Sequence, residues 1–139
     1  MQPCEAKFRE VEKQLDTSVE CAIPALEASG ITCQDNSSRS YHYKVGYLMW
    51  EQIFTREWDA DLQTALVQVR LLYPEPVHPS DPVLINVWVS AEKYRPGQES
   101  TLKERTESKV QLEALLETGL EAVVIQQFKI GAKIVGQAL

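Results

Sequence analysis

Two stretches of alternating residues constrain the fold of this chain more than any other feature. In residues 83–94 the odd positions from Val83 to Ala91 are all apolar, whereas the even positions mix apolar and polar side chains. Residues 63–73 repeat the pattern, with apolar side chains at the odd positions from Ala65 to Tyr73. Because successive side chains of a strand point to opposite faces of a sheet, both stretches predict β-strands with one apolar and one mixed face.

A third stretch, residues 41–56, is rich in β-branched and aromatic residues and predicts a strand that precedes these two. Residues 57–61 are few enough for a hairpin, whereas residues 74–82 contain four prolines and predict a stiffer loop outside the sheet. The short connection favours antiparallel pairing, so the three strands are expected to form a meander.

The first thirty residues have the periodicity of an amphipathic helix. Seven of them fall on one stripe at about 100° per residue, and this stripe has to be buried against another element. They are Cys4, Phe8, Val11, Leu15, Val19, Ala22 and Leu26. We expect Pro24 to kink or interrupt the helix before Gly30 ends it.

A second helix is predicted over residues 102–118, because Thr101 and Glu104 have the spacing of a capping box. Residues 119–139 fit a continued helix, although 123–130 also suit a strand; we favour helix because residues 107–121 are mostly good helix formers. Without a repeat or linker, residues 1–139 predict a single α+β domain. Its expected architecture is a three-stranded or larger antiparallel meander packed by N- and C-terminal helices, in the order α-β-β-β-α.

Charge and hydropathy exclude several classes of function. Twenty acidic and 14 basic residues give a net charge of −6, which opposes binding to nucleic-acid phosphates. The apolar runs are far shorter than the roughly 20 residues that cross a bilayer, and the first residues lack the apolar core of a secretion signal. We therefore expect a cytoplasmic protein that binds neither nucleic acid nor a membrane.

No residue pattern points to catalysis, a cofactor or a metal. The common dinucleotide, hydrolase and zinc motifs are absent, and His42 and His78 are far apart in the sequence. Glu57, Asp59 and Asp61 gather three carboxylates in one turn, but turn-forming aspartates explain them more simply than a cation site does. The odd number of cysteines, without metal-ligand spacing, predicts free thiols.

Gly131 and Gly136 have the glycine spacing of a phosphate-binding loop. Gln137 and Ala138 stand where such a loop needs lysine and serine or threonine. We interpret the two glycines as helix packing or as part of a frayed end.

The strongest candidate for a functional surface is the mixed face of the two best strands. It carries amides, an arginine and an indole, and the first strand would add Trp50 and His42 if its even residues share this face. The candidate binding residues are Trp50, Gln68, Arg70, Asn86 and Trp88. Tryptophan and arginine are enriched where interfaces concentrate their binding energy, but a face covered by one of the chain's own helices has the same pattern.

We expect a small acidic protein without catalytic activity that binds another protein, or a second copy of itself, through this mixed face. Chaperones, immunity or antitoxin proteins and assembly adaptors are of this kind. The alternative is a small-molecule-binding protein or small enzyme, with a cavity between sheet and helices lined by Tyr43, Tyr47, Trp88 and Arg95. A structural subunit of a larger assembly is a third reading. No cofactor is expected.

Overall fold

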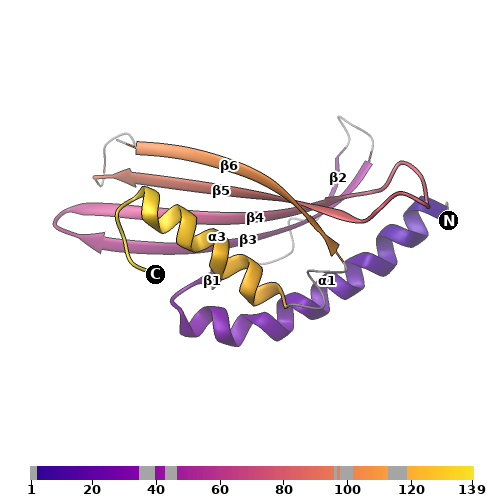
Figure 1. Cartoon of the computed structure of the whole chain (residues 1–139), viewed down its shortest axis with the longest axis horizontal. Helices are drawn as coiled ribbons and strands as arrows, with labels where there is room; N and C mark the ends of the chain where they lie inside the picture. The colour runs from indigo at the N-terminus through magenta and orange to yellow at the C-terminus, as the bar shows by residue number, and fades with distance from the viewer. Residues whose placement is uncertain (1–2, 35–39, 43–46, 96, 98–101, 113–118) are drawn as a thin grey trace.

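The computed structural model describes residues 3–34, 40–42, 47–95, 97, 102–112 and 119–139. These residues contain two long helices and a six-stranded sheet, arranged as in Figure 1. The elements are α1 (Pro3–Ala28), β1 (Thr32–Cys33), β2 (Ser40–His42), β3 (Tyr47–Ala60), β4 (Gln63–Pro74), β5 (Leu84–Tyr94), β6 (Leu102–Gln111) and α3 (Leu120–Ile134).

The strands form one antiparallel sheet. Strands β3, β4, β5 and β6 are neighbours in chain order, and β1 and β2 both pair with β3. Hairpin-linked neighbours make a meander, and one helix precedes and one follows it. The predicted fold class is confirmed: an α+β meander packed by N- and C-terminal helices.

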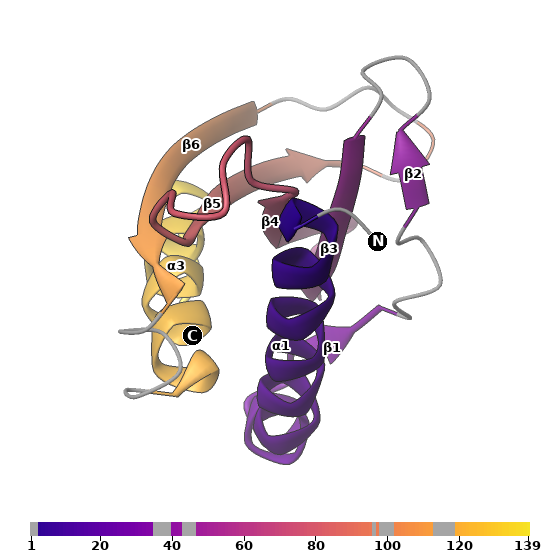
Figure 2. The same ribbon diagram turned by 90° about the vertical axis from the view of Figure 1, so that its right-hand side faces the viewer.

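Both helices lie on the same side of the sheet. Figure 2 shows the sheet curving around α1 and α3, which occupy its concave side. We call this the inner face, defined by buried residues such as Phe54, Val69 and Val87, and the opposite side the outer face. No helix among the described residues has the length and apolar character needed to span a membrane.

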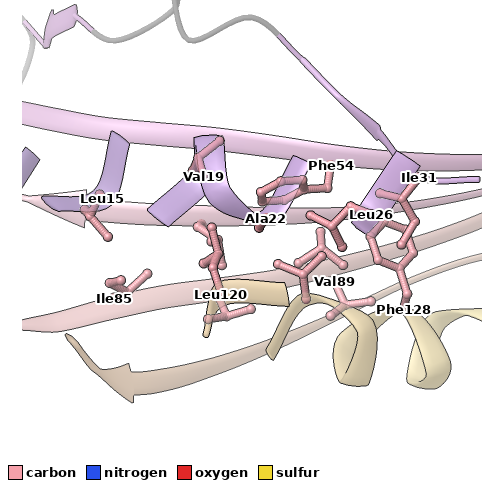
Figure 3. Close-up of a cluster of buried hydrophobic side chains, with 14 of the residues drawn as sticks. Leu15, Val19, Ala22, Leu26, Ile31, Phe54, Ile85, Val89, Leu120 and Phe128 are labelled. Carbon is pink, nitrogen blue, oxygen red and sulfur yellow. The ribbon is translucent and has the colours of Figure 1, made fainter. Parts of the chain in front are cut away.

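The core fills the space between the inner face and the two helices. The buried stripe of α1 is the predicted one from Phe8 to Leu26, while Cys4 is only partly buried. Figure 3 shows side chains of α1 meeting side chains of the sheet and of α3. The buried members drawn there include Leu15, Val19, Leu26, Phe54, Ile85, Val89, Leu120 and Phe128. Full burial of each large apolar side chain contributes roughly 1.5–3 kcal/mol to stability, so this contact holds the helices on the sheet.

Helix α1 ends at a glycine, as predicted. Gly30 has a φ of 78°, and the amides of Gly30 and Ile31 donate to the carbonyl oxygens of Glu27 and Leu26, both at 3.0 Å. This is the Schellman arrangement, in which a left-handed residue closes the last turn. Pro24 does not end the helix, which continues to Ala28.

The helix predicted over residues 102–118 is wrong for its first ten residues, which form β6. This strand pairs with β5 from Lys93↔Leu102 to Leu84↔Gln111. The prediction depended on the capping-box spacing of Thr101 and Glu104, a local signal that pairing with a neighbouring strand overrides. Thr101 and residues 113–118 lie outside the described residues, whereas the favoured helix after Gly119 is confirmed as α3.

The single strand predicted over residues 41–56 is also corrected. The chain forms two strands here, β2 and β3, which pair with each other from Ser40↔Met49 to His42↔Tyr47. Strand β3 then continues to Ala60 and pairs with Gln63, so only Asp61 and Leu62 remain in the turn. The hairpin is therefore tighter than the expected five-residue connection.

The turn of this hairpin should tolerate a stabilising substitution. Asp61 and Leu62 have φ values of 50° and 63°, the left-handed region that costs a leucine about 1–2 kcal/mol. Two-residue turns of this type favour Asn-Gly. We expect the double variant Asp61→Asn, Leu62→Gly to gain about 1 kcal/mol in free energy of unfolding, measured by urea denaturation. Leu62→Ala keeps the strained backbone and should gain nothing; equal stability of the two variants would contradict this explanation.

Gly131 allows α3 to approach the sheet closely. A Cβ atom at this position would lie 2.4 Å from Cγ1 of Val67 and 3.3 Å from Cγ1 of Val89. Val67 is fully buried and its short branched side chain has little freedom to move. Gly131 is therefore a helix-packing glycine, in agreement with the first of the two interpretations of this glycine pair.

Gly131→Ala should destabilise the protein although alanine is the better helix former. Overpacking costs about 1–3 kcal/mol and the gain in helix propensity offsets about 1 kcal/mol of it, so we expect a net loss of up to about 2 kcal/mol by thermal or urea unfolding. Val67→Ala makes room for the added methyl group. The double variant should be at least about 0.5 kcal/mol more stable than the sum of the single effects; strict additivity would show that this contact is not the cause.

Candidate functional site

The outer face consists of the side chains that alternate with the buried ones along β3, β4 and β5. The register of the three strands aligns these residues in rows across the sheet. The first row is Ile53, Arg70 and Trp88, the second is Thr55, Gln68 and Ser90, and the third is Glu51, Leu72 and Asn86. All nine are partly exposed, since both long helices of the described chain cover the opposite face.

A shallow hollow lies at the centre of this face. It has a volume of about 160 Å³ and is bounded by the first row together with neighbours from the other two. Its lining residues are Ile53, Gln68, Arg70, Leu72, Trp88 and Ser90. Apolar walls with a guanidinium, an amide and a hydroxyl at their edges are typical of a site that accepts a side chain of another molecule.

The polar groups around the hollow are only loosely held. The Nε atom of Arg70 lies 3.7 Å from a carboxylate oxygen of Glu51, and 44 % of the arginine side chain is exposed. The amide of Gln68 donates to the hydroxyl of Thr55 at 3.4 Å. An ion pair as exposed as this contributes about 0–1 kcal/mol, so both partners can be rearranged at low cost when another molecule binds.

Four of the five predicted binding residues are brought together on this face. Gln68, Arg70 and Trp88 line the hollow, and Asn86 lies one row away opposite Leu72. Their role in binding stays a prediction.

Trp50 is the exception, and its expected place on the outer face is wrong. It pairs with Tyr73, is fully buried on the inner face, and donates its indole N–H to Asp16 of α1 at 3.1 Å. The physical reason is the two-residue turn between β3 and β4, which pairs each even residue of β3 with an odd residue of β4. Ile53 takes the place on the outer face that Trp50 was expected to occupy.

Of the four residues predicted to line a small-molecule cavity between sheet and helices, the structure describes the side chains of two. Trp88 lies on the outer face, away from the helices, and Arg95 is an exposed residue just after β5. Tyr43 lies outside the described residues. For Tyr47 and His42 the structure gives only the backbone pairing between β2 and β3.

The remaining candidate groups have structural explanations. Asp59 accepts a hydrogen bond from the hydroxyl of Thr64 at 2.7 Å, across the base of the hairpin. The described ranges contain no group of three histidine, cysteine or carboxylate side chains that could hold a metal ion. Cys4, Cys21 and Cys33 are free thiols, as predicted. Burial, with a smaller contribution from Glu27, raises the pKa of the Cys33 thiol to about 11.

Comparison of the chain with protein-family models, with curated proteins and with solved structures found no match.

Tyr73 provides a test of core burial through its titration. Its ring stacks on Phe8 with 5.5 Å between centroids, and its buried hydroxyl has no hydrogen-bond partner among the described residues. Burial raises the pKa of Tyr73 from 10.0 to about 12. Above pH 10 the unfolded chain therefore loses this proton while the folded protein keeps it, so stability falls as the pH rises from 10 to about 12.

We expect Tyr73→Phe to remove this part of the alkaline destabilisation, measured by urea unfolding from pH 8 to 12. At pH 7 the variant should be as stable as the wild type or up to about 1 kcal/mol more stable, because no hydrogen bond is lost. A loss of more than 1 kcal/mol at pH 7 would show that the hydroxyl has a partner.

Proposed function

We propose that this protein is a binding module without catalytic activity, and that its outer face recognises another protein or a second copy of the chain. The observation that carries the proposal is the hollow around Trp88 and Arg70 on a face that neither α1 nor α3 covers. Partly exposed apolar side chains in such a position favour burial against a partner.

The size of the hollow favours a protein ligand over a small molecule. Its volume of about 160 Å³ is below the roughly 300–1,000 Å³ of pockets that enclose drug-sized ligands. It is large enough for roughly five water molecules at ~30 Å³ each. One inserted side chain of a partner fits this space, with Trp88 as the apolar anchor and Arg70 at the rim.

The curvature of the outer face favours some partners over others. The sheet is convex on its outer side, because it curves around the helices (Figure 2). Two convex faces touch over a limited area, whereas a concave or extended partner follows the curve over several strands. A complex that is stable on its own buries roughly 800 Å² per partner, which favours a different protein over a second copy that presents the same convex face.

We also propose a cytoplasmic location. Its support is the set of three free thiols, since thiols persist in compartments that keep cysteine reduced.

Trp88→Ser should abolish binding through the outer face. Hot-spot tryptophans contribute about 2 kcal/mol or more, so we expect at least a tenfold loss of the partner captured from an extract of the native host, quantified by mass spectrometry. Self-association, measured by analytical ultracentrifugation, should fall in parallel if the partner is a second copy. Far-UV circular dichroism should stay nearly unchanged.

Val77→Ser is the matched control, because Val77 is 79 % exposed but lies in the loop after β4, outside the hollow. It should bind like the wild type. If the wild type, Trp88→Ser and Val77→Ser capture the same proteins and sediment alike, the outer face is not the binding surface.

A further inference from the structure

A second, larger hollow lies beside α1, where the helix passes β1 and β3. Its volume is about 360 Å³, within the range of small-molecule sites and about twice that of the outer hollow. One wall consists of side chains from successive turns of α1, and the other comes from the sheet edge. The lining residues that matter are Asp16, Val19, Glu20, Ile23, Cys33 and Gln52.

Gln52 is the unusual member of this set. Only 2 % of it is exposed, and its amide nitrogen donates to the carbonyl oxygens of Gln34 at 2.7 Å and Ile53 at 3.3 Å. These bonds fix the amide plane. Its carbonyl oxygen has no hydrogen-bond partner within the described part of the chain. A buried acceptor without a donor costs about 1–3 kcal/mol, and each such group in a folded protein requires an explanation.

Two carboxylates face the same hollow. Asp16 and Glu20 are one helical turn apart on α1, a spacing at which like charges destabilise a helix. Asp16 is held in place by the indole N–H of Trp50 at 3.1 Å. Together the two residues give this side of the hollow an acidic character that a cation complements.

The other lining residues are apolar or uncharged. Val19 is buried and Ile23 partly buried, and they supply apolar contact next to the carboxylates. The Cys33 thiol has a pKa of about 11, raised mainly by burial, so it stays neutral at physiological pH. The lining therefore offers hydrogen-bond acceptors and negative charge beside an apolar wall.

We propose that this hollow is a binding site for a small organic cation: an alkylammonium or guanidinium group on a short apolar stem. The carboxylates of Asp16 and Glu20 bind the charge, the oxygen of Gln52 accepts one of its hydrogen bonds, and Val19 and Ile23 contact the stem. The Gln52 oxygen is already shielded from water in the folded protein, so ligand binding does not have to dehydrate it. A donor reaches it after a side-chain shift of the kind that commonly accompanies binding. The site is independent of the outer face.

The probe for this proposal is n-butylammonium, with butan-1-ol as its neutral counterpart. In ¹H–¹⁵N NMR spectra of the full chain, the side-chain NH₂ signals of Gln52 and the indole N–H of Trp50 report on the hollow directly. We expect n-butylammonium to shift both in a saturable way, with a Kd of millimolar order or tighter. Butan-1-ol should bind at least fivefold more weakly.

Asp16→Asn is the decisive variant, because it removes the charge and keeps an oxygen for the Trp50 N–H. It should weaken n-butylammonium binding at least fivefold. Glu10→Gln removes an equal charge from an exposed position of the same helix and should bind like the wild type. Gln52→Met has a side chain of similar length but no acceptor, and it should also weaken binding. If this variant does not fold, the comparison of Asp16→Asn with Glu10→Gln decides the test.

Three results would overturn the proposal. They are the absence of a saturable shift up to 50 mM n-butylammonium, equal affinity for butan-1-ol, and equal weakening by Asp16→Asn and Glu10→Gln. The last would show a general charge effect rather than a site.

Discussion

The pairing of β3 with β4 determines which side chains of these strands are buried under the helices and which lie on the outer face. The two strands pair in continuous register from Met49↔Pro74 to Ala60↔Gln63. A shift of β3 by one residue would move Trp50 and Phe54 to the outer face and bring Glu51 and Thr55 under the helices. Burying a carboxylate without a partner costs far more than the exchange of one strand hydrogen bond, so the core and the register stabilise each other.

Residue patterns predicted the α1 stripe, the strands β4 and β5, and the general architecture, because these signals depend only on local periodicity. They missed β6, whose Lys and Glu residues favour a helix until β5 offers an edge to pair with. Trp50 was misplaced because register depends on the length of the turn, and Asp61-Leu62 lacks the glycine that would have marked it. Gln52 could not be found either, since its significance comes from a hollow between segments distant in the sequence.

Strand β3 contributes to both proposed sites through neighbouring residues. Ile53 points to the outer hollow and Gln52 to the hollow beside α1, because adjacent residues of a strand point to opposite faces. The two sites also differ in chemistry: one has an arginine at its rim, and the other is larger and lined by hydrogen-bond acceptors. One sheet would thus carry the proposed recognition surface on one side and the proposed ligand site on the other.

The most direct test of this account is the register of the central strands, measured by nuclear Overhauser contacts between backbone protons. The structure predicts cross-strand contacts between Trp50 and Tyr73 and between Arg70 and Trp88. Contacts of Trp50 with Leu72 or Pro74, in place of Tyr73, would mean that β3 is shifted by one position. In that case neither the outer hollow nor the hollow beside α1 would exist as described.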